Sequence, residues 1–319
     1  MCRHQSYDKL RVLDTTLRDG AQTPHIHLAF SDKYLIAKYL AHVGVDIIEI
    51  GFAGNEHEIE GMKKIAKIGS REYSQADDVP IICCFTKSTG SVDKPDYSCI
   101  DRAYECVSSA DPDKRMLHLF VGTSKELINY RHPKKEAEVL EIIKSSVTYA
   151  RGLLGNNGYL EFSPEDATRA DIDFLIEAAQ TAIDNGAIVV NITDTTGFSP
   201  PDKYYNTVAT LKKNLSRAEN VVFSTHVHND SGNAVATTLK GILAGARQIE
   251  GTILQLGERA GNVDWMTVVT NLIVLEDYYK VYAKNIKTSY FYQLAMLVSG
   301  LVEQPIPLNF PIMGKKRFF

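Results

Sequence analysis

The chain has 319 residues, of which 44% are hydrophobic and 23% charged, so it can form a substantial core and is not a disordered, collagen-like or mini-protein sequence. Its net charge of −4 disfavours broad binding to nucleic acid or to an anionic membrane. No apolar run is long enough to predict a membrane-spanning helix, and the N-terminal residues lack the apolar core of a signal peptide. The five cysteines show no CxxC spacing, so we expect a soluble protein of a reducing compartment, the cytoplasm.

Short β-branched apolar runs bounded by Gly, Pro, Asp and Ser recur along the chain, and each predicts a strand buried on both faces. The eight predicted strands cover residues 11–17, 46–52, 80–86, 116–123, 159–163, 187–193, 221–229 and 248–256. Segments of helical period lie between them, at 31–44, 168–186, 202–213 and 231–245. This alternation predicts an α/β fold with parallel strands and right-handed crossovers, and eight units make a (β/α)8 TIM barrel. A doubly wound open sheet is the alternative.

One more apolar helix is predicted at 290–302, followed by a proline-rich segment without a clear period. We therefore divide the chain into a TIM-barrel catalytic domain, residues 1–283, and a short C-terminal helical tail with a truncated linker segment, residues 284–319.

Polar and ionisable side chains follow most of the predicted strands. In a barrel of this class the C-terminal ends of the strands converge on one mouth, where the chemistry takes place. We therefore expect these residues to lie together: Arg18 and Asp19 after the first strand, His118 on the fourth, Ser163 and Glu165 at the fifth, Thr195 after the sixth, His226 and His228 on the seventh, and Asn262 beyond the eighth.

His226 and His228 are the sharpest signal among these residues. Two residues apart on a strand, their imidazoles point to the same face and can reach one point. With Asp19 and Asn262 from neighbouring strand ends, they predict a divalent metal site rather than two hydrogen-bonded core histidines. Nitrogen and oxygen ligands without a thiolate suit Mg²⁺, Mn²⁺, Zn²⁺ or Co²⁺, and the sequence does not choose among these ions.

Each remaining candidate also has a structural explanation. Asp19 could organise a turn, His118 could be a core histidine, and Thr195 could be a turn hydroxyl. Residues 163–166 (SPED) also fit the start of a helix, with a serine cap followed by proline and acids. We interpret the adjacent residues 258–259 as an ion pair beside the site.

Six motifs in order resemble the 2-isopropylmalate synthase/homocitrate synthase family of HMG-CoA lyase-like, metal-dependent TIM barrels. They are DTTLRDGAQ (14–22), similar to the family's DTTLRDGEQ, LHLFVGTS (117–124), EFSPEDATR (161–169), NITDTTGFSPP (191–201), HVHND (226–230), similar to its HxHND metal motif, and GERAGN (257–262). The resemblance covers about residues 10–315, and GERAGN favours the isopropylmalate synthase branch.

This resemblance implies an acyltransferase of amino-acid biosynthesis, in particular leucine biosynthesis. Such an enzyme joins acetyl-CoA, or another acyl-CoA, to a 2-oxo acid in a Claisen condensation and then hydrolyses the thioester to a 2-hydroxy diacid. Carried over by motif, Asp19, His226 and His228 would hold the metal, with Asn262 as a fourth or nearby ligand. Family analogy also implies a homodimer.

The resemblance assigns roles to further residues as well. Arg18 would stabilise the developing alkoxide, and Thr195 would bind the substrate carboxylate. The oxo-acid pocket would also include Gln22, His118, Ser163 and Glu165, with His118 and Glu165 as catalytic residues and Glu165 assisting proton transfer.

The sequence departs from the family pattern at several positions. Ala21 stands where the family has glutamate, Pro24-His25 stands where it has Pro-Gly, and the run 250–257 differs from ECTINGIG. The chain stops at Phe319, where relatives enter a linker subdomain. A lyase or aldolase of the same superfamily, and a non-catalytic barrel that binds metal or ligand, are therefore the alternatives. The sequence does not identify the oxo acid or the acyl-CoA.

Overall fold

A computed structural model describes residues 8–52, 54, 56–90, 93–131, 135–283 and 285–314. Eight parallel strands form a closed barrel in the order β10-β11-β2-β3-β4-β7-β8-β9, and they correspond one by one to the predicted strands. Their bounds are β2 (Arg11–Asp14), β3 (Ile47–Phe52), β4 (Ile81–Lys87), β7 (Arg115–Gly122), β8 (Tyr159–Glu165), β9 (Val189–Asp194), β10 (Val222–Val227) and β11 (Gln248–Gly251). The TIM-barrel prediction is confirmed, because β11 pairs with β2 and closes the sheet.

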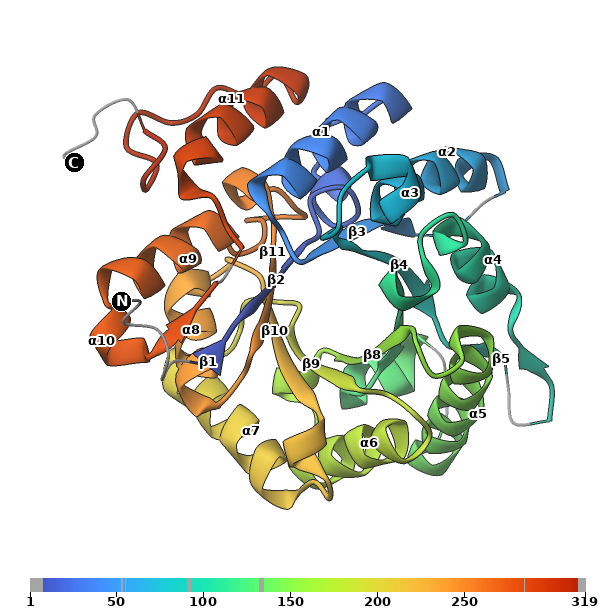
Figure 1. Ribbon diagram of the computed structural model, residues 1–319. Helices are drawn as coiled ribbons and strands as arrows, with labels where there is room; N and C mark the ends of the chain where they lie inside the picture. The colour runs from blue at the N-terminus through green and yellow to red at the C-terminus, as the bar shows by residue number, and fades with distance from the viewer. Residues whose placement is uncertain are drawn as a thin grey trace.

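Helices form a ring around the barrel (Figure 1). They are α1 (Phe30–Val43), α2 (Glu56–Ala66), α3 (Arg71–Ser74), α4 (Ser98–Val107), α5 (Glu136–Leu154), α6 (Ile172–Asp184), α7 (Pro201–Asn214), α8 (Ala234–Ala244), α9 (Trp265–Val274), α10 (Glu276–Tyr279) and α11 (Phe291–Leu301). The helix predicted from residue 168 begins at Ile172, because the Asp171 side chain accepts hydrogen bonds from the backbone N–H groups of Asp173 and Phe174 and caps it there.

Residues 163–166 do not start a helix, so that interpretation is wrong. Strand β8 continues through Pro164 to Glu165. Proline is tolerated here because β8 pairs with β9 only at Glu161 and Phe162, so its last residues pair with β7 alone. The Ser163 side chain is thereby placed on a strand instead of capping a helix.

The end of the described chain returns to its beginning. Strand β12 (Val281–Tyr282) pairs with β1 (Asp8–Lys9), and α11 packs beside α1 (Figure 1). The domain division at residues 283 and 284 stays a prediction. In the described part of the chain, no helix combines the length and apolar character needed to cross a membrane. The four described cysteines, Cys83, Cys84, Cys99 and Cys106, are buried and free.

The barrel interior has an apolar layer below and a polar layer above. The apolar layer consists of Leu13, Ile47, Ile81, Cys83, Met116 and Val189. Because side chains two residues apart on a strand share a face, β3, β7 and β9 each carry a polar group one step nearer the C-terminal end. Ile47 is followed by Glu49, Met116 by His118 and Val189 by Asn191, all buried. The strand period therefore places the polar groups directly below the barrel mouth.

The apolar layer can be tested at Met116, which is fully buried. We expect Met116→Ala to lower the free energy of unfolding by about 2–5 kcal/mol, because it leaves a cavity between strands that cannot collapse. Met116→Leu keeps the volume and should cost less than about 1.5 kcal/mol. Urea unfolding followed by circular dichroism measures both values. Equal losses in the two variants would show that this layer is not closely packed.

Candidate active site

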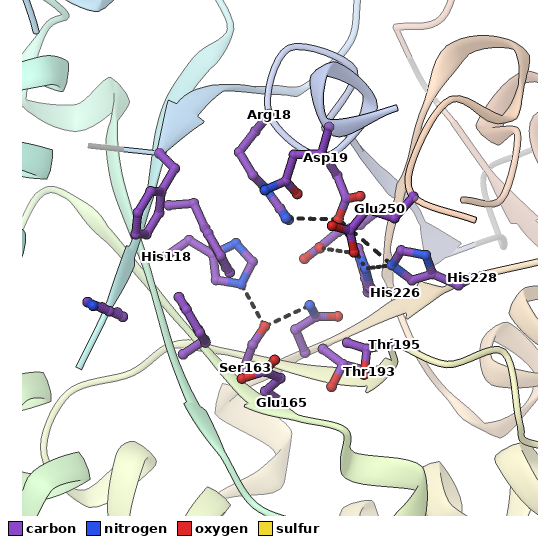
Figure 2. Close-up of a pocket in the computed structure, with 17 residues that line it drawn as sticks. Arg18, Asp19, His118, Ser163, Glu165, Thr193, Thr195, His226, His228 and Glu250 are labelled. Carbon is purple, nitrogen blue, oxygen red and sulfur yellow. Dashed lines mark hydrogen bonds and ion pairs between the residues drawn. The ribbon is translucent and has the colours of Figure 1, made fainter. Parts of the chain in front are cut away.

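A cavity of about 370 Å³ opens at the C-terminal ends of the strands (Figure 2). It is lined by nine of the predicted site residues: Arg18, Asp19, Gln22, His118, Ser163, Glu165, Thr195, His226 and His228. The lining also includes residues that the sequence analysis did not select: Phe52, Phe85, Lys87, Phe120, Asn191, Thr193, Glu250 and, as part of an expected ion pair, Glu258. Among the predicted residues, Asn262 does not line the cavity and is fully buried beside it.

Three buried side chains converge on one side of the cavity. His226 Nε2 lies 3.1 Å from His228 Nε2, and Asp19 Oδ2 lies 3.6 Å from His226 Nε2 and 3.8 Å from His228 Nε2. Figure 2 shows the three groups facing one another. Asn262 donates from Nδ2 to Asp19 Oδ1 at 3.0 Å, while its Oδ1 atom has no hydrogen-bond partner among the described residues. Asn262 is thus placed as a neighbour of Asp19.

The loops that carry these residues are held by hydrogen bonds to the Asp14 side chain and by close backbone packing at Gly261. Asp14, at the end of β2, accepts hydrogen bonds from the Thr16 backbone and hydroxyl, and from the Trp265 indole at 2.7 Å. These bonds fix the turn that leads to Asp19. In the loop before Asn262, Gly261 has φ +82, and a Cβ there would lie 1.7 Å from the Gln255 carbonyl oxygen. Only glycine fits this position.

The residues present fit a divalent metal ion. Glu250 Oε2 lies 3.1 Å from His226 Nδ1, so the carboxylate receives the Nδ1 proton and leaves the Nε2 lone pair facing the cluster. Burial, reinforced by the charge of His226, lowers the pKa of His228 to about 4, so this imidazole is neutral near pH 7. Burial opposes ionisation of Asp19, but Arg18 and the two histidines outweigh it and lower the pKa of Asp19 to about 2. Burial opposes a charge on His226, but the hydrogen bond and charge of Glu250, together with Asp19, raise its pKa. One carboxylate oxygen and two imidazole nitrogens therefore meet, with the Arg18 guanidinium beside the same oxygen of Asp19.

Arg18 is fixed on three sides at the edge of this cluster. Its Nε atom lies 2.7 Å from Glu49 Oε2, and its Nη1 atom lies 2.8 Å from Asp19 Oδ2. The guanidinium carbon lies 4.1 Å from the centre of the Phe85 ring, within cation–π range. The arginine is therefore held in one orientation in the cavity wall.

Glu49 is the residue that connects the two halves of the site. It is fully buried, and besides Arg18 it accepts hydrogen bonds from Thr15 Oγ1 at 2.5 Å and from His118 Nδ1 at 2.9 Å. Burial opposes its charge, but the charge of Arg18 and the hydrogen bond from His118 prevail and hold the pKa of Glu49 below its usual range. His118 Nε2 in turn lies 2.6 Å from Ser163 Oγ (Figure 2).

Two buried glutamates, Glu161 and Glu250, lie near the cluster of Asp19, His226 and His228. Gln248 Nε2 donates to both oxygens of Glu161, at 3.1 and 3.0 Å. Burial, with the nearby charge of Glu250, raises the pKa of Glu161 well above its usual range. Burial opposes ionisation of Glu250 too, but His118 and His226 lower its pKa. The pKa values of the two glutamates are therefore shifted in opposite directions, and Glu250, whose pKa is lowered, contacts His226.

Sequence reasoning missed Glu49, Glu161 and Glu250 as members of the site, although each interrupts an apolar strand. A charged residue inside such a run is almost never buried without a partner, and this is the signal that could have found them. The expected ion pair at residues 258–259 is present at 3.6 Å, but Arg259 contacts Asp230 more closely, at 2.7 Å. Arg259 also donates to the Thr195 backbone carbonyl, which holds that residue at the rim.

The fold and the site define an α/β barrel whose mouth carries a buried group of residues that could hold a metal ion. The chain belongs to the HMGL-like family, which matches residues 9–298. A 2-isopropylmalate synthase of Acetivibrio thermocellus is 38% identical over 311 residues, which are 97% of this chain and 57% of that protein. A 2-isopropylmalate synthase of Pyrococcus abyssi is also 38% identical, over 97% of this chain and 60% of its own length. The chain thus spans less than two thirds of these relatives.

A solved structure shares the fold at lower identity. It is an HMG-CoA lyase from Acinetobacter baumannii in complex with coenzyme A and 3-methylmalate. It superposes with a TM-score of 0.72 and 18% identity, over 98% of this chain and 97% of that one. The similarity confirms the barrel architecture.

The metal-ligand group can be tested by replacing its two histidines together. We expect the His226→Ala/His228→Ala double variant to lose stoichiometric binding of a divalent ion, because a single carboxylate remains at the site. Equilibrium dialysis with Mn²⁺ measures the stoichiometry. His27→Ala, which removes an exposed histidine after β2, is the matched control and should bind like the unmodified protein. Undiminished binding by the double variant would contradict the assignment.

Glu250 offers a second test of the same group. Glu250→Gln removes the charge that holds the Nδ1 proton of His226, and we expect a 10- to 100-fold loss of metal affinity. Glu258→Gln removes a carboxylate of the same cavity that pairs with Arg259, and its affinity should change little. Isothermal titration with Mn²⁺ gives both constants. Equal affinities of the two variants would show that Glu250 does not support the ligand.

Proposed function

We propose that this protein catalyses a metal-dependent Claisen condensation of acetyl-CoA with a 2-oxo acid, followed by hydrolysis of the thioester, as in 2-isopropylmalate synthesis. The single observation that carries this proposal is the meeting of Asp19, His226 and His228 with Arg18 in one cavity at the barrel mouth. The two 2-isopropylmalate synthases, each 38% identical over 97% of the chain, support the choice of reaction. The coenzyme A bound in the lyase structure supports an acyl-CoA as one substrate.

We assign the metal to Asp19, His226 and His228, with Asn262 held beside Asp19. A divalent ion bound there, Mg²⁺, Mn²⁺, Zn²⁺ or Co²⁺, would act as a Lewis acid on the carbonyl group of the oxo acid. The donor set, two imidazoles and a carboxylate, suits each of these ions.

The residues of the chain supply the remaining chemistry. Negative charge develops on the oxo-acid carbonyl oxygen when an enolate attacks it, and Arg18, fixed by Glu49, Asp19 and Phe85, presents its positive charge to that oxygen. A donor fixed in advance stabilises such charge without reorganising during the reaction. We assign binding of the substrate carboxylate to Thr195 and a further substrate contact to Gln22, because both side chains line the cavity.

Formation of the enolate needs a base, because the methyl group of the acyl-CoA must lose a proton. Glu165, at the end of β8, lines the same cavity as Arg18, and we assign it this proton transfer. Phe52, Phe85 and Phe120 form the apolar part of the lining, which fits an uncharged side chain on the oxo acid.

A panel assay tests the proposed reaction. With acetyl-CoA, Mn²⁺ and a series of 2-oxo acids, we expect release of free thiol that depends on both the metal and one of the oxo acids, followed with a thiol reagent. If protein that binds the metal released no thiol with any of the 2-oxo acids, the proposal would be contradicted. Production of acetyl-CoA from a hydroxyacyl-CoA, without net condensation, would instead support a lyase.

Arg18 provides a test of the charge stabilisation. We expect Arg18→Lys to lower kcat by about 10²- to 10³-fold, because lysine cannot keep the contacts to Glu49, Asp19 and Phe85 together. Arg71→Lys, at a surface pair with Asp111 and Asp113, is the matched control and should keep its rate. An unchanged kcat in the Arg18→Lys variant would show that Arg18 does not stabilise the developing charge.

A further inference from the structure

Three buried side chains form a continuous line of hydrogen bonds from the barrel interior to the cavity. Glu49 Oε1 lies 2.9 Å from His118 Nδ1, and His118 Nε2 lies 2.6 Å from Ser163 Oγ. Glu49 is 0% exposed, His118 1% and Ser163 3%. His118 and Ser163 line the cavity, where Figure 2 shows their contact. The line therefore joins a buried carboxylate to a hydroxyl group that substrate can reach.

The direction of each hydrogen bond follows from the chemistry of its groups. Glu49 is ionised beside Arg18, so it can only accept, and His118 must carry its proton on Nδ1. In the neutral imidazole, the form that can act as a base, Nε2 is then a lone pair and Ser163 Oγ donates its hydroxyl proton to it. Asn191 Nδ2 donates to Ser163 Oγ at 2.8 Å and completes the assignment.

This polarity is that of an activated serine. A nucleophilic hydroxyl is recognised by a hydrogen bond to a base that is itself oriented by a third group, whatever the fold or the sequence order. Ser163, His118 and Glu49 meet both distance requirements and come from three different strands, β8, β7 and β3. The contact from Asn191 uses one lone pair of Ser163 Oγ and leaves the other for an incoming carbon atom.

We propose that Ser163 is the nucleophile of the hydrolytic step, with His118 as its general base and Glu49 as the residue that orients His118. This inference rests on the proposed function, since condensation leaves the product as a CoA thioester that must be cleaved. Direct attack by a water activated at His118 is disfavoured, because Glu49 occupies one ring nitrogen and Ser163 occupies the other.

The step balances with water as the only co-reactant. Ser163 Oγ forms a bond to the thioester carbon while His118 Nε2 takes the hydroxyl proton. The C–S bond then breaks, and the leaving thiolate takes that proton and departs as free CoA. Water next attacks the acyl-serine ester and gives a proton to His118, the C–Oγ bond breaks, and His118 returns the proton to Ser163. Thioester and water thus yield a carboxylic acid and a thiol.

The two half-reactions can be measured separately in the metal-loaded protein. Condensation is followed as consumption of the 2-oxo acid with labelled acetyl-CoA. Hydrolysis is followed as thiol release from preformed 2-isopropylmalyl-CoA. We expect Ser163→Ala to lower hydrolysis by at least about a thousandfold. Because Ser163 also lines the cavity that holds the oxo acid, the condensation rate of this variant should fall as well, but far less than its hydrolysis rate, so that the hydroxyacyl-CoA accumulates.

A matched control and a covalent readout accompany this variant. Thr225→Val removes an equally buried strand hydroxyl that has no hydrogen-bond partner among the described residues and faces Gly241 of α8, so both rates should be unchanged. In the unmodified protein, acid quenching during turnover and peptide mass spectrometry should find the acyl group on Ser163. This readout does not depend on whether Ser163→Ala folds, and Ser163→Cys, which keeps a nucleophile, should also form an adduct.

Several results would overturn the inference. Equal losses of both half-reactions in Ser163→Ala would show that Ser163 only positions substrate, and full hydrolysis by that variant would exclude it as the nucleophile. Absence of an acyl adduct on Ser163 during hydrolysis would do the same. Failure of the proposed function has a different signature: the unmodified protein would consume no oxo acid, while hydrolysis of the preformed thioester still reports on Ser163.

Discussion

The compensation of buried charge inside the barrel is the constraint on which the site depends. Asp19, Glu49 and Glu250 are ionised and buried, and Arg18 is the cation that pairs with the first two. Glu250 pairs with His226, and its charge raises the pKa of His226 although burial opposes this. Buried carboxylates are costly unless they are paired, and a divalent cation held by Asp19, His226 and His228 would add to this pairing.

One residue of this network would serve both steps of the proposed reaction. Glu49 holds Arg18 on one oxygen and His118 on the other, so in the proposed mechanism the charge that faces the condensation and the base that faces the hydrolysis are oriented by the same carboxylate. A change at Glu49 would disturb both half-reactions together, whereas a change at Ser163 would mainly affect the hydrolysis. In the proposed mechanism the two steps would thus be coupled through a residue that does not line the cavity.

The fold could be predicted from the sequence because its signals are local. Apolar runs such as 46–52 and the helices between them need no knowledge of their neighbours, and the barrel mouth follows from their order. The meeting of His226 and His228 could be predicted for the same reason, since they share a face of one strand, while their binding of a metal stays a prediction. Glu250 could not be predicted as a member of the site, because its role depends on lying opposite His226 in the register of β10 and β11. The helix start predicted at Pro164 was wrong because the local sequence favours one, whereas the absence of pairing between Pro164 and β9 depends on the tertiary structure.

The two layers of the barrel interior also limit how such a chain can change over time. Three strands place an apolar side chain low and a polar one two positions higher: Ile47 and Glu49 on β3, Met116 and His118 on β7, and Val189 and Asn191 on β9. Inserting or deleting a single residue within a strand would turn its acid or histidine outward toward the helices and point a neighbour inward. Length differences among related barrels should therefore gather in the loops, while strand lengths between the two layers stay constant.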